Sequence, residues 1–384
     1  MEDYENICLC ALNGIFGYEP EIALALIGAL GSASAVFGMS DATKEELLGP
    51  YNKYRGRLSS EEIDKAGSVL EKVKSFGGNF VGITSQDYPS RLKQCPDAPV
   101  GLFFKSMDAP QALFGKAHYV AVVGTRSLSP CGEVNCRELV RRLACAENPP
   151  CVVSGLAYGA DIVAQASAVE AGLPTIGVMA TGVDTVYPAP HRHFAAKLTS
   201  LPGCGLVTDY PPGTAPVAVN FLRRNRIIAG LADAVILVES AVRGGGMNTC
   251  RLAFSYDREV YVLPGRLDDV HSQGCNRLLR EGIAGVIDSF DDLNVRLGLG
   301  ADIRRPDRPA IQESVIRRYG RMLPSDKLET MSEIIRTIRN HKGADLDEIA
   351  AVLSLPGHVV AELASLLEAD GLIRIDLLRR CTIV

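Results

Sequence analysis

Seven short apolar runs, separated by helical stretches, constrain the fold of this 384-residue chain more than any other feature. Runs of this kind, without regular polar alternation, are typical of strands buried on both faces of a parallel sheet. The expected strands span residues 119–123, 151–153, 175–179, 205–208, 234–238, 259–263 and 285–287. Such repeated alternation of strands and helices predicts an α/β fold with a doubly wound parallel sheet.

Different patterns flank this central region. Residues 1–76 predict short helices arranged like a helix-hairpin-helix or SAM-like module, and their net acidic charge favours packing or protein contact over DNA binding. Residues 77–297 form the expected sheet domain, and the Arg- and Pro-rich residues 298–325 a linker. Residues 326–384 predict three helices (327–340, 345–353 and 358–369) and two strands (372–375 and 381–384), which is the order of a winged helix.

Composition excludes several classes of protein. The net charge is −5, so any contact with nucleic acid must come from a local patch rather than a basic tail. The eleven cysteines include no C-x-x-C pair, and no histidine stands at ligand spacing, so we expect neither zinc nor another cofactor. The acidic start and the absence of a long apolar run predict a cytoplasmic protein without membrane contact.

Four loops that follow expected strands are rich in glycine and small polar residues. They span residues 124–132, 154–161, 181–188 and 243–249. Carboxyl ends of parallel strands meet at one edge of the sheet, and glycines there let the backbone approach a ligand closely. The loops together predict a phosphate-binding site. None contains G-x-G-x-x-G or G-x-x-x-x-G-K-[ST], so neither a dinucleotide nor a Walker-type ATPase is indicated.

Residues 221–230, Phe-Leu-Arg-Arg-Asn-Arg-Ile-Ile-Ala-Gly, place three arginines at what we expect to be the start of an otherwise apolar helix. A helix N-terminus attracts anions, and guanidinium groups strengthen such a site. We expect Arg224 and Arg226 to be solvated in the free protein. Replacing both with alanine should then leave folding nearly intact.

Catalytic arrangements are sparse. Asp161, Asp184 and Glu239 are candidate acids or bases. No Ser/His/Asp or Cys/His arrangement accompanies them, so we expect these carboxylates to cap helices or to orient a loop arginine. The expected protein is not an enzyme.

The loops, in this order, resemble the DNA processing protein A (DprA/Smf) family. The matching pieces are residues 123–126, 154–161, 182–188, 224–230, 264–265 and 274–276, within a stretch that runs from Asp87 to Ala284. The flanking helical module and the winged helix are also similar to those of the three-part members. The resemblance implies an extended Rossmann-like domain that binds single-stranded DNA, protects it and helps load the RecA recombinase in natural transformation and recombination, as a homodimer.

The resemblance also implies roles for single residues. Arg126 would contact phosphate, Phe221 would stack on a base, and the arginines of the 221–230 segment would line the pocket, as in binders that combine stacking with positive charge. The expected DNA-binding residues are Gly124, Arg126, Ser129, Ser154, Gly155, Gly159, Phe221, Arg223, Arg224, Asn225, Arg226, Gly244, Gly245, Gly246, Asn248 and Asn276.

Three positions depart from the family pattern. Residues 244–250 replace a serine-containing loop, which removes one phosphate donor. Cys131 stands where an aromatic residue is common, and His191 where asparagine often stands.

Two other functions compete with this interpretation. The sheet is also similar to that of nucleotide phosphoribohydrolases, but residues 244–253 lack the acidic residue of their Pro-Gly-Gly-x-Gly-Thr-x-x-Glu loop. A sequence-specific regulator could use the winged helix. Its expected recognition helix, residues 359–368, contains neither Lys nor Arg, which base and phosphate contacts normally need.

Overall fold

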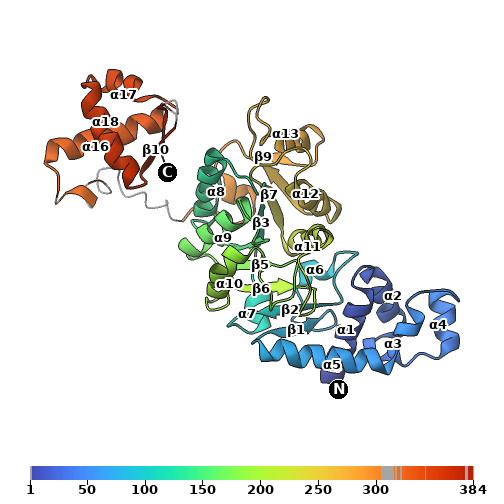
Figure 1. Cartoon of the computed structure of the whole chain (residues 1–384). Coiled ribbons are helices and arrows are strands. Elements are labelled where there is room, and N and C mark those ends of the chain that lie inside the picture. The colour runs from blue at the N-terminus through green and yellow to red at the C-terminus, as the bar shows by residue number, and fades with distance from the viewer. Residues whose placement is uncertain are drawn as a thin grey trace. The chain divides into compact units, whose positions relative to one another are not determined.

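The computed structural model describes residues 2–303 continuously and, after them, residues 315, 318–320, 322–341, 343–376 and 379–383. The chain divides into two compact units, Met1–Ile303 and Arg304–Val384 (Figure 1). Much of the expected linker, residues 304–314, lies outside the described residues.

A nine-stranded sheet forms the centre of the first unit, in the order β1-β2-β6-β5-β4-β3-β7-β8-β9. The strands are β1 (Asn79–Gly82), β2 (Gly101–Lys105), β3 (Tyr119–Val123), β4 (Cys151–Ser154), β5 (Thr175–Val178), β6 (Gly205–Thr208), β7 (Ala234–Leu237), β8 (Glu259–Val262) and β9 (Gly285–Val286). Strands β3 to β9 are all parallel to their neighbours within this group. All seven expected strands are therefore confirmed, with ends that differ by at most one residue.

Strands β1 and β2 are additional to the prediction. They pair with each other in antiparallel fashion, and β2 continues the sheet by pairing antiparallel to β6, with Phe103 opposite Thr208. The helices that follow them, α6 (Ser90–Lys93) and α7 (Pro110–Phe114), have only four and five residues, so the sequence shows no helical periodicity that would extend the alternation to this edge.

Helices cover both faces of the sheet, as a doubly wound fold requires. Along β3, Val120 and Val122 pack with α8 (Pro130–Leu143) and α9 (Ala160–Glu170), whereas Ala121 and Val123 belong to the core beneath α11 (Ala218–Leu231) and α12 (Gly245–Ser255). Because strand side chains alternate between faces, an entirely apolar strand supplies both cores. Figure 1 shows the two helix layers on opposite sides of the strands.

The remaining helices of this unit are short or belong to the N-terminal region. They are α1 (Glu2–Phe16), α2 (Pro20–Leu30), α3 (Ala33–Phe37), α4 (Asp41–Leu48), η1 (Arg55–Arg57), α5 (Ser60–Ser75), α6 (Ser90–Lys93), α7 (Pro110–Phe114), η2 (Ala189–His191), α10 (Arg192–Leu198), α13 (Gln273–Arg280) and α14 (Leu293–Arg296). Leu9, Leu12 and Phe16 of α1 share one hydrophobic cluster with Val81 and Val123 of the sheet. The expected helical module thus shares a core with the sheet, and a domain boundary at residues 76/77 stays a prediction.

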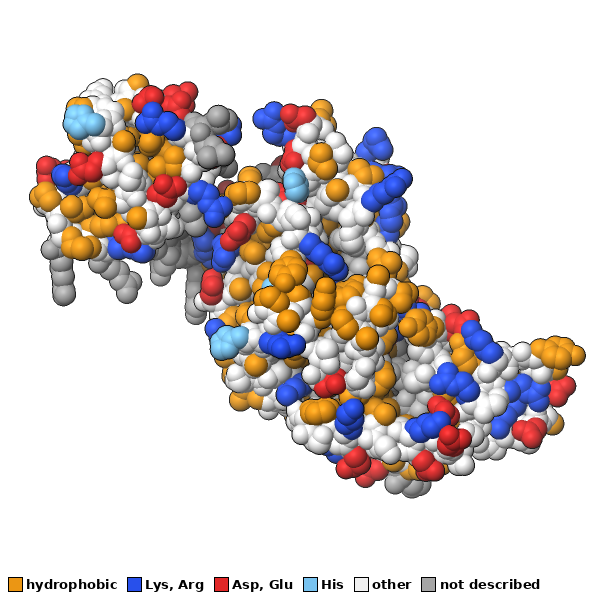
Figure 2. All heavy atoms as spheres, in the orientation of Figure 1, with side chains coloured by type: hydrophobic (Ala, Val, Ile, Leu, Met, Phe, Trp, Pro, Cys, Tyr) orange, Lys and Arg blue, Asp and Glu red, His pale blue; other side chains and the backbone are white. Residues whose placement is uncertain are grey.

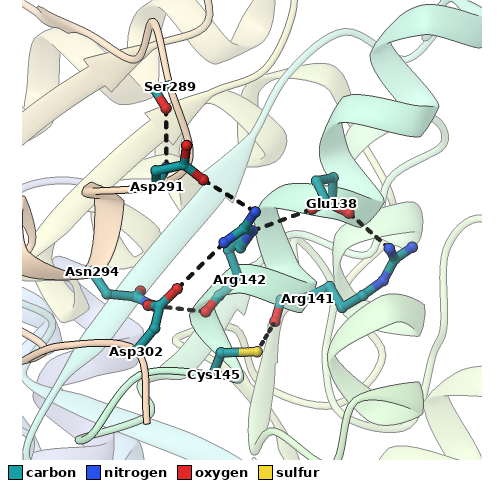
Figure 3. A network of polar contacts seen from close by, with 8 residues as sticks. All are labelled: Glu138, Arg141, Arg142, Cys145, Ser289, Asp291, Asn294 and Asp302. Carbon is teal, nitrogen blue, oxygen red and sulfur yellow. Dashed lines mark hydrogen bonds and ion pairs between the residues drawn. The ribbon is translucent and has the colours of Figure 1, made fainter. Parts of the chain in front are cut away.

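A polar network fastens the last segment of the first unit to α8 (Figure 3). The guanidinium group of Arg142 donates hydrogen bonds to Glu138 at 3.3 Å, Asp291 at 3.3 Å and Asp302 at 3.4 Å. The Asn294 amide donates to the Arg142 carbonyl and to Asp302, both at 2.7 Å. The place where the chain leaves this unit is therefore fixed by several side chains.

In the part of the second unit that the structure describes, helical residues at 315 and 318–319 precede three longer helices and a two-stranded antiparallel hairpin. These are α16 (Ser325–Asn340), α17 (Leu346–Leu353), α18 (Gly357–Ala369), β10 (Ile373–Ile375) and β11 (Cys381–Ile383). Asp345 and Glu348 form a capping box at the start of α17. This order matches the prediction, while the assignment as a winged helix stays an expectation.

Within the described part of the chain, no single helix is long and apolar enough to cross a membrane. The sharply bent pair α17 and α18 reaches the required length and composition only when both helices are counted together.

Candidate functional site

Three of the four glycine-containing loops meet at the carboxyl edge of the sheet. The Thr125 amide donates to the Glu239 carbonyl at 2.8 Å, and the Ala160 amide donates to the Thr125 carbonyl at 3.1 Å. These bonds join the loops that follow β3, β4 and β7. The convergence predicted from the sequence is therefore present.

Gly159 makes this close approach possible. Its φ is +73°, and a Cβ atom at this position would lie 2.2 Å from the Thr125 carbonyl oxygen. Any other residue would push the two loops apart. The backbone contact between the loops thus depends on glycine at this position.

The arginine-rich segment lies in the middle of α11 and not at its start. The helix begins at Ala218, after the extended residue Val217, so Arg223, Arg224 and Arg226 follow more than one complete turn. Their amides are consequently within the helical hydrogen-bond pattern and are not available to an anion. The prediction that these arginines strengthen a helix N-terminus is wrong.

Arg224 is buried, with 3% of its surface exposed, and points beneath the sheet edge. Its Nη1 donates to the Val178 carbonyl, and the strongest electrostatic attraction on its charge comes from Asp161. A Cβ atom at Gly155 would lie 2.0 Å from this Nη1, so glycine leaves the space that the guanidinium group fills. Burial lowers the pKa of Arg224, an effect that Asp161 opposes.

Arg226 forms a buried ion pair on another side of α11. Its Nη2 lies 2.5 Å from Asp209 Oδ2, with side-chain exposures of 6% and 4%, and its Nη1 donates to the Asp97 carbonyl. Burial lowers the pKa of Arg226, but attraction to Asp209 and Asp97 outweighs this effect and raises it above the ordinary value. The expectation that Arg224 and Arg226 are solvated is wrong.

Arg223 connects α11 to the N-terminal helices. Its guanidinium group lies over the Tyr18 ring, 4.2 Å from the centroid, and donates to the carbonyls of Tyr18 at 3.0 Å and of Gly17. Asn225 is also buried, at 7% exposure. The polar residues of this segment therefore hold α11 in place on several sides.

An aromatic and cationic group remains accessible at the same edge. Phe221 is half-buried, and its ring lies 5.3 Å from the exposed Tyr187 ring at an interplanar angle of 62°. The guanidinium group of the exposed Arg126 lies 5.3 Å from the Phe221 centroid. Arg243, in the loop before α12, is exposed as well. We name Arg126, Tyr187 and Phe221 the edge cluster, and Arg243 lies in the loop that follows β7 at the same edge of the sheet.

Figure 2 shows hydrophobic side chains over the middle of this unit, in the region where Figure 1 places α10 and α11, with Lys and Arg side chains among them. Leu222 is 54% exposed and Val219 48% exposed on the same helix. Tyr187 and Arg243 were not among the expected site residues. Their sequence signals were available, since Tyr187 precedes Pro188 and Arg243 precedes the glycines of a predicted ligand loop.

Several expected polar contacts are used within the protein. Ser129 caps α8 by accepting from the Gly132 amide at 2.9 Å, while its hydroxyl donates to Glu239. Ser154 is fully buried and donates to the Val122 carbonyl at 2.7 Å. Asn276 bonds both the amide and the carbonyl of Gly265, and Asn248 donates to the Leu222 carbonyl at 3.4 Å. These side chains shape the loops.

The glycines before α12 differ in their surroundings. A Cβ atom at Gly244 would meet Ser240 Oγ at 2.1 Å, and one at Gly246 would lie 3.4 Å from the Gly124 Cα, whereas Gly245 faces open space. Gly244 and Gly246 thus permit close packing, and Gly245 leaves the start of an eleven-residue helix accessible.

The candidate acids, which were expected to cap helices or to orient a loop arginine, accept hydrogen bonds from loop amides. Asp161 accepts from the Gly155 amide at 3.1 Å, Asp184 accepts from the Gly213 amide at 3.1 and 3.0 Å, and Glu239 accepts from the Ser129 amide at 2.9 Å. Burial raises the pKa of Asp161, against the attraction of Arg224. Among the described residues, no group of three or more His, Cys, Asp or Glu side chains could hold a metal ion.

The fold and this edge define an α/β protein whose glycine-containing loops gather at the carboxyl ends of a doubly wound sheet, without a Walker or dinucleotide motif. Comparison with known families is more specific. Residues 79–298 match the model of DNA recombination-mediator protein A, and the chain belongs to that DNA processing protein family.

Individual relatives agree with this assignment. A Mycobacterium tuberculosis relative is 32% identical over 325 residues, covering 81% of this chain and 78% of its own length. DNA processing protein DprA of Streptococcus pneumoniae is 38% identical over 234 residues, covering 60% of this chain and 78% of the relative. Its crystal structure superposes with a TM-score of 0.64 at 28% identity, covering 76% of this chain and 97% of that one.

A second solved structure concerns the single-stranded DNA binding mode of DNA processing protein A from Helicobacter pylori. It superposes with a TM-score of 0.51 at 29% identity and covers 57% of this chain and 95% of its own.

Proposed function

We propose that this protein binds single-stranded DNA at the edge cluster. The observation that carries the proposal is the accessible Tyr187–Phe221 aromatic pair with the Arg126 guanidinium group over the Phe221 ring. Proteins that bind single strands without sequence preference combine stacking surfaces for bases with positive charge for phosphates. The single-stranded DNA binding of the Helicobacter pylori relative supports the same assignment.

The proposed contacts divide among the edge cluster, Arg243 and the backbone. Phe221 and Tyr187 stack on bases, and Arg126 and Arg243 contact phosphates. The exposed residue Gly245, at the start of α12, receives a further phosphate on its amide, because a helix N-terminus favours anions. Arg224 and Arg226, in contrast, support the site from below without touching DNA.

We further propose that the protein protects the strand and helps load the RecA recombinase in natural transformation and recombination, as a homodimer in the cytoplasm. Membership of a recombination-mediator family supports this role. The protein acts without catalysis, because the carboxylates near the edge, the buried Asp161 and Glu239 and the exposed Asp184, are engaged with loop amides. No observation favours the phosphoribohydrolase alternative. The C-terminal unit is proposed to be a winged helix that contacts protein.

Fluorescence anisotropy with labelled oligothymidine and a duplex of equal length tests the proposal across a range of salt concentrations. Phe221→Ala should weaken single-strand binding by about 1–3 kcal/mol, the usual contribution of one stacked base. Arg126→Gln should reduce the slope of log K against log[salt] by about 0.7, the value for one phosphate contact on a single strand.

Matched controls are Tyr51→Ala and Lys93→Gln, which remove a fully exposed aromatic ring and an exposed charge elsewhere. Both controls should bind like the wild-type protein. Equal affinity of the wild type for duplex and single strand, or unchanged binding by Phe221→Ala, would contradict the proposal.

A further inference from the structure

A second feature of the first unit is a cavity of about 470 Å³ beside the loop that follows β5. It lies between the end of α5, the end of β2, the start of β6 and α10. The lining residues on which the argument depends are Phe76, Lys105, Val183, Asp184, Val186 and Arg192. Its volume is within the range of small-ligand pockets.

The cavity combines an apolar surface with two available cations. Phe76, at the end of α5, is 38% exposed, and Val183, Val186 and Leu206 supply further apolar surface. No ion pair or side-chain hydrogen bond joins Lys105 or Arg192 to any described residue.

Asp184 is the opposing charge in the cavity. Both of its oxygens accept a hydrogen bond from the Gly213 amide, at 3.1 and 3.0 Å, so this carboxylate is directed toward the next loop. The two positive charges of Lys105 and Arg192 exceed the single negative charge of Asp184. A ligand with an aromatic or apolar part and a negative charge fits such a lining.

One loop contributes to both the cavity and the edge cluster. Val186 lines the cavity, and the next residue, Tyr187, packs against Phe221. The two sites are therefore linked through adjacent residues of the loop that follows β5. For a DNA strand that stacks on Phe221 and Tyr187, this cavity is a neighbouring surface that is both basic and apolar.

We propose that this cavity is a second nucleotide subsite, in which one base of the bound strand packs on Phe76 and the flanking phosphates meet Lys105 and Arg192. The inference rests on the proposed single-strand binding. It makes the N-terminal helical region part of the DNA path, because Phe76 ends α5. Oligonucleotides long enough to extend past the loop at Tyr187 gain affinity from this subsite, and shorter oligonucleotides do not.

The test compares Lys105→Gln/Arg192→Gln and Phe76→Ala with wild type in the full chain. Anisotropy is measured with oligothymidines from about 4 to about 16 nucleotides, the range of site sizes known for single-strand binding folds. On long oligonucleotides the double variant should reduce the salt slope by about 1.4, the value for two phosphate contacts. Phe76→Ala should lower affinity for them by roughly tenfold.

The matched control is Lys93→Gln/Lys197→Gln, which removes two exposed charges from α6 and α10 without touching the cavity. It should bind both long and short oligonucleotides like wild type. Melting temperatures of all variants show whether the fold is retained.

The outcomes separate the two proposals. If wild type shows no salt-dependent single-strand binding, the proposed function itself fails. If wild type binds but the double variant leaves the long-strand salt slope unchanged, the second subsite is refuted. An equal loss on the shortest and longest oligonucleotides also refutes it. Saturable binding of free thymidine monophosphate that the double variant abolishes, with long-strand binding intact, reassigns the cavity to a free nucleotide.

Discussion

The burial of Arg226 leads to a strong prediction about stability. Arg226→Ala removes one partner of the ion pair with Asp209, which is 2.5 Å long and nearly inaccessible to solvent. It leaves the Asp209 carboxylate buried without its cation and takes a donor from the Asp97 carbonyl. Breaking a buried pair in this way costs about 3–5 kcal/mol, because the remaining charge is uncompensated.

The expected result is a large fall in the melting temperature of the first unit. For domains of somewhat smaller size, 1 kcal/mol corresponds to about 2–4 °C, so we expect a decrease of roughly 6–20 °C. Circular dichroism melting of the full chain measures it, with Arg126→Ala as the exposed-arginine control. The control should change the melting temperature by less than about 2 °C, as surface substitutions usually do.

A paired replacement distinguishes loss of charge compensation from loss of volume. Arg226→Met/Asp209→Leu removes both charges together, and we expect it to recover most of the lost stability, since apolar residues often replace buried pairs without penalty. If Arg226→Ala melts within about 2 °C of wild type and loses DNA binding, Arg226 acts as a ligand-binding residue and the structural interpretation is refuted.

Gly155→Ala should destabilise the protein by displacing Arg224. In a double-mutant cycle with Arg224→Ala, the changes in the free energy of unfolding in urea should couple by more than about 0.5 kcal/mol, and strictly additive changes would refute the steric interpretation. Asp161→Asn tests the raised pKa of the Asp161 carboxyl group. Because the folded state binds this proton more tightly than the unfolded state, protonated Asp161 adds to the free energy of unfolding below about pH 4, and this contribution declines as pH rises through the folded pKa. The wild-type stability minus that of Asp161→Asn should therefore fall with rising pH, and a rise would contradict the sign. Deleting residues 326–384 should leave oligonucleotide affinity within about threefold, under about 1 kcal/mol, because these residues carry 7 basic and 10 acidic side chains. A loss above about tenfold at matched salt would show that residues 326–384 contact DNA.

The sheet could be predicted from the sequence because each central strand is apolar on both sides. Tyr119–Val123 and Ala234–Leu237 have no polar residue to suggest a solvated face, and their pattern alone indicates a parallel sheet. The glycine loops were also predictable, since the carboxyl ends of such strands must meet. The edge strands β1 and β2 were missed, because the helices that follow them, α6 and α7, have only four and five residues and are too short to show helical periodicity.

The burial of the arginines could not be predicted in the same way. Arg224 and Arg226 are charged, and their partners Asp161 and Asp209 are distant in the sequence or separated by a Pro-rich loop. Only the tertiary structure shows that each guanidinium group has an acceptor and an acid within the core. Pro216, two residues before the first helical residue, is a signal that could have placed the helix start correctly.

The fit of Arg224 against Gly155 also has an evolutionary consequence. A side chain at residue 155 and an arginine at residue 224 cannot occupy the same space, so neither position can change freely while the other is retained. Across relatives, glycine at position 155 should accompany arginine at position 224, and a larger residue at 155 should appear only with a smaller one at 224. The exposed Arg126 has no such steric partner, and substitutions there should be independent of both positions.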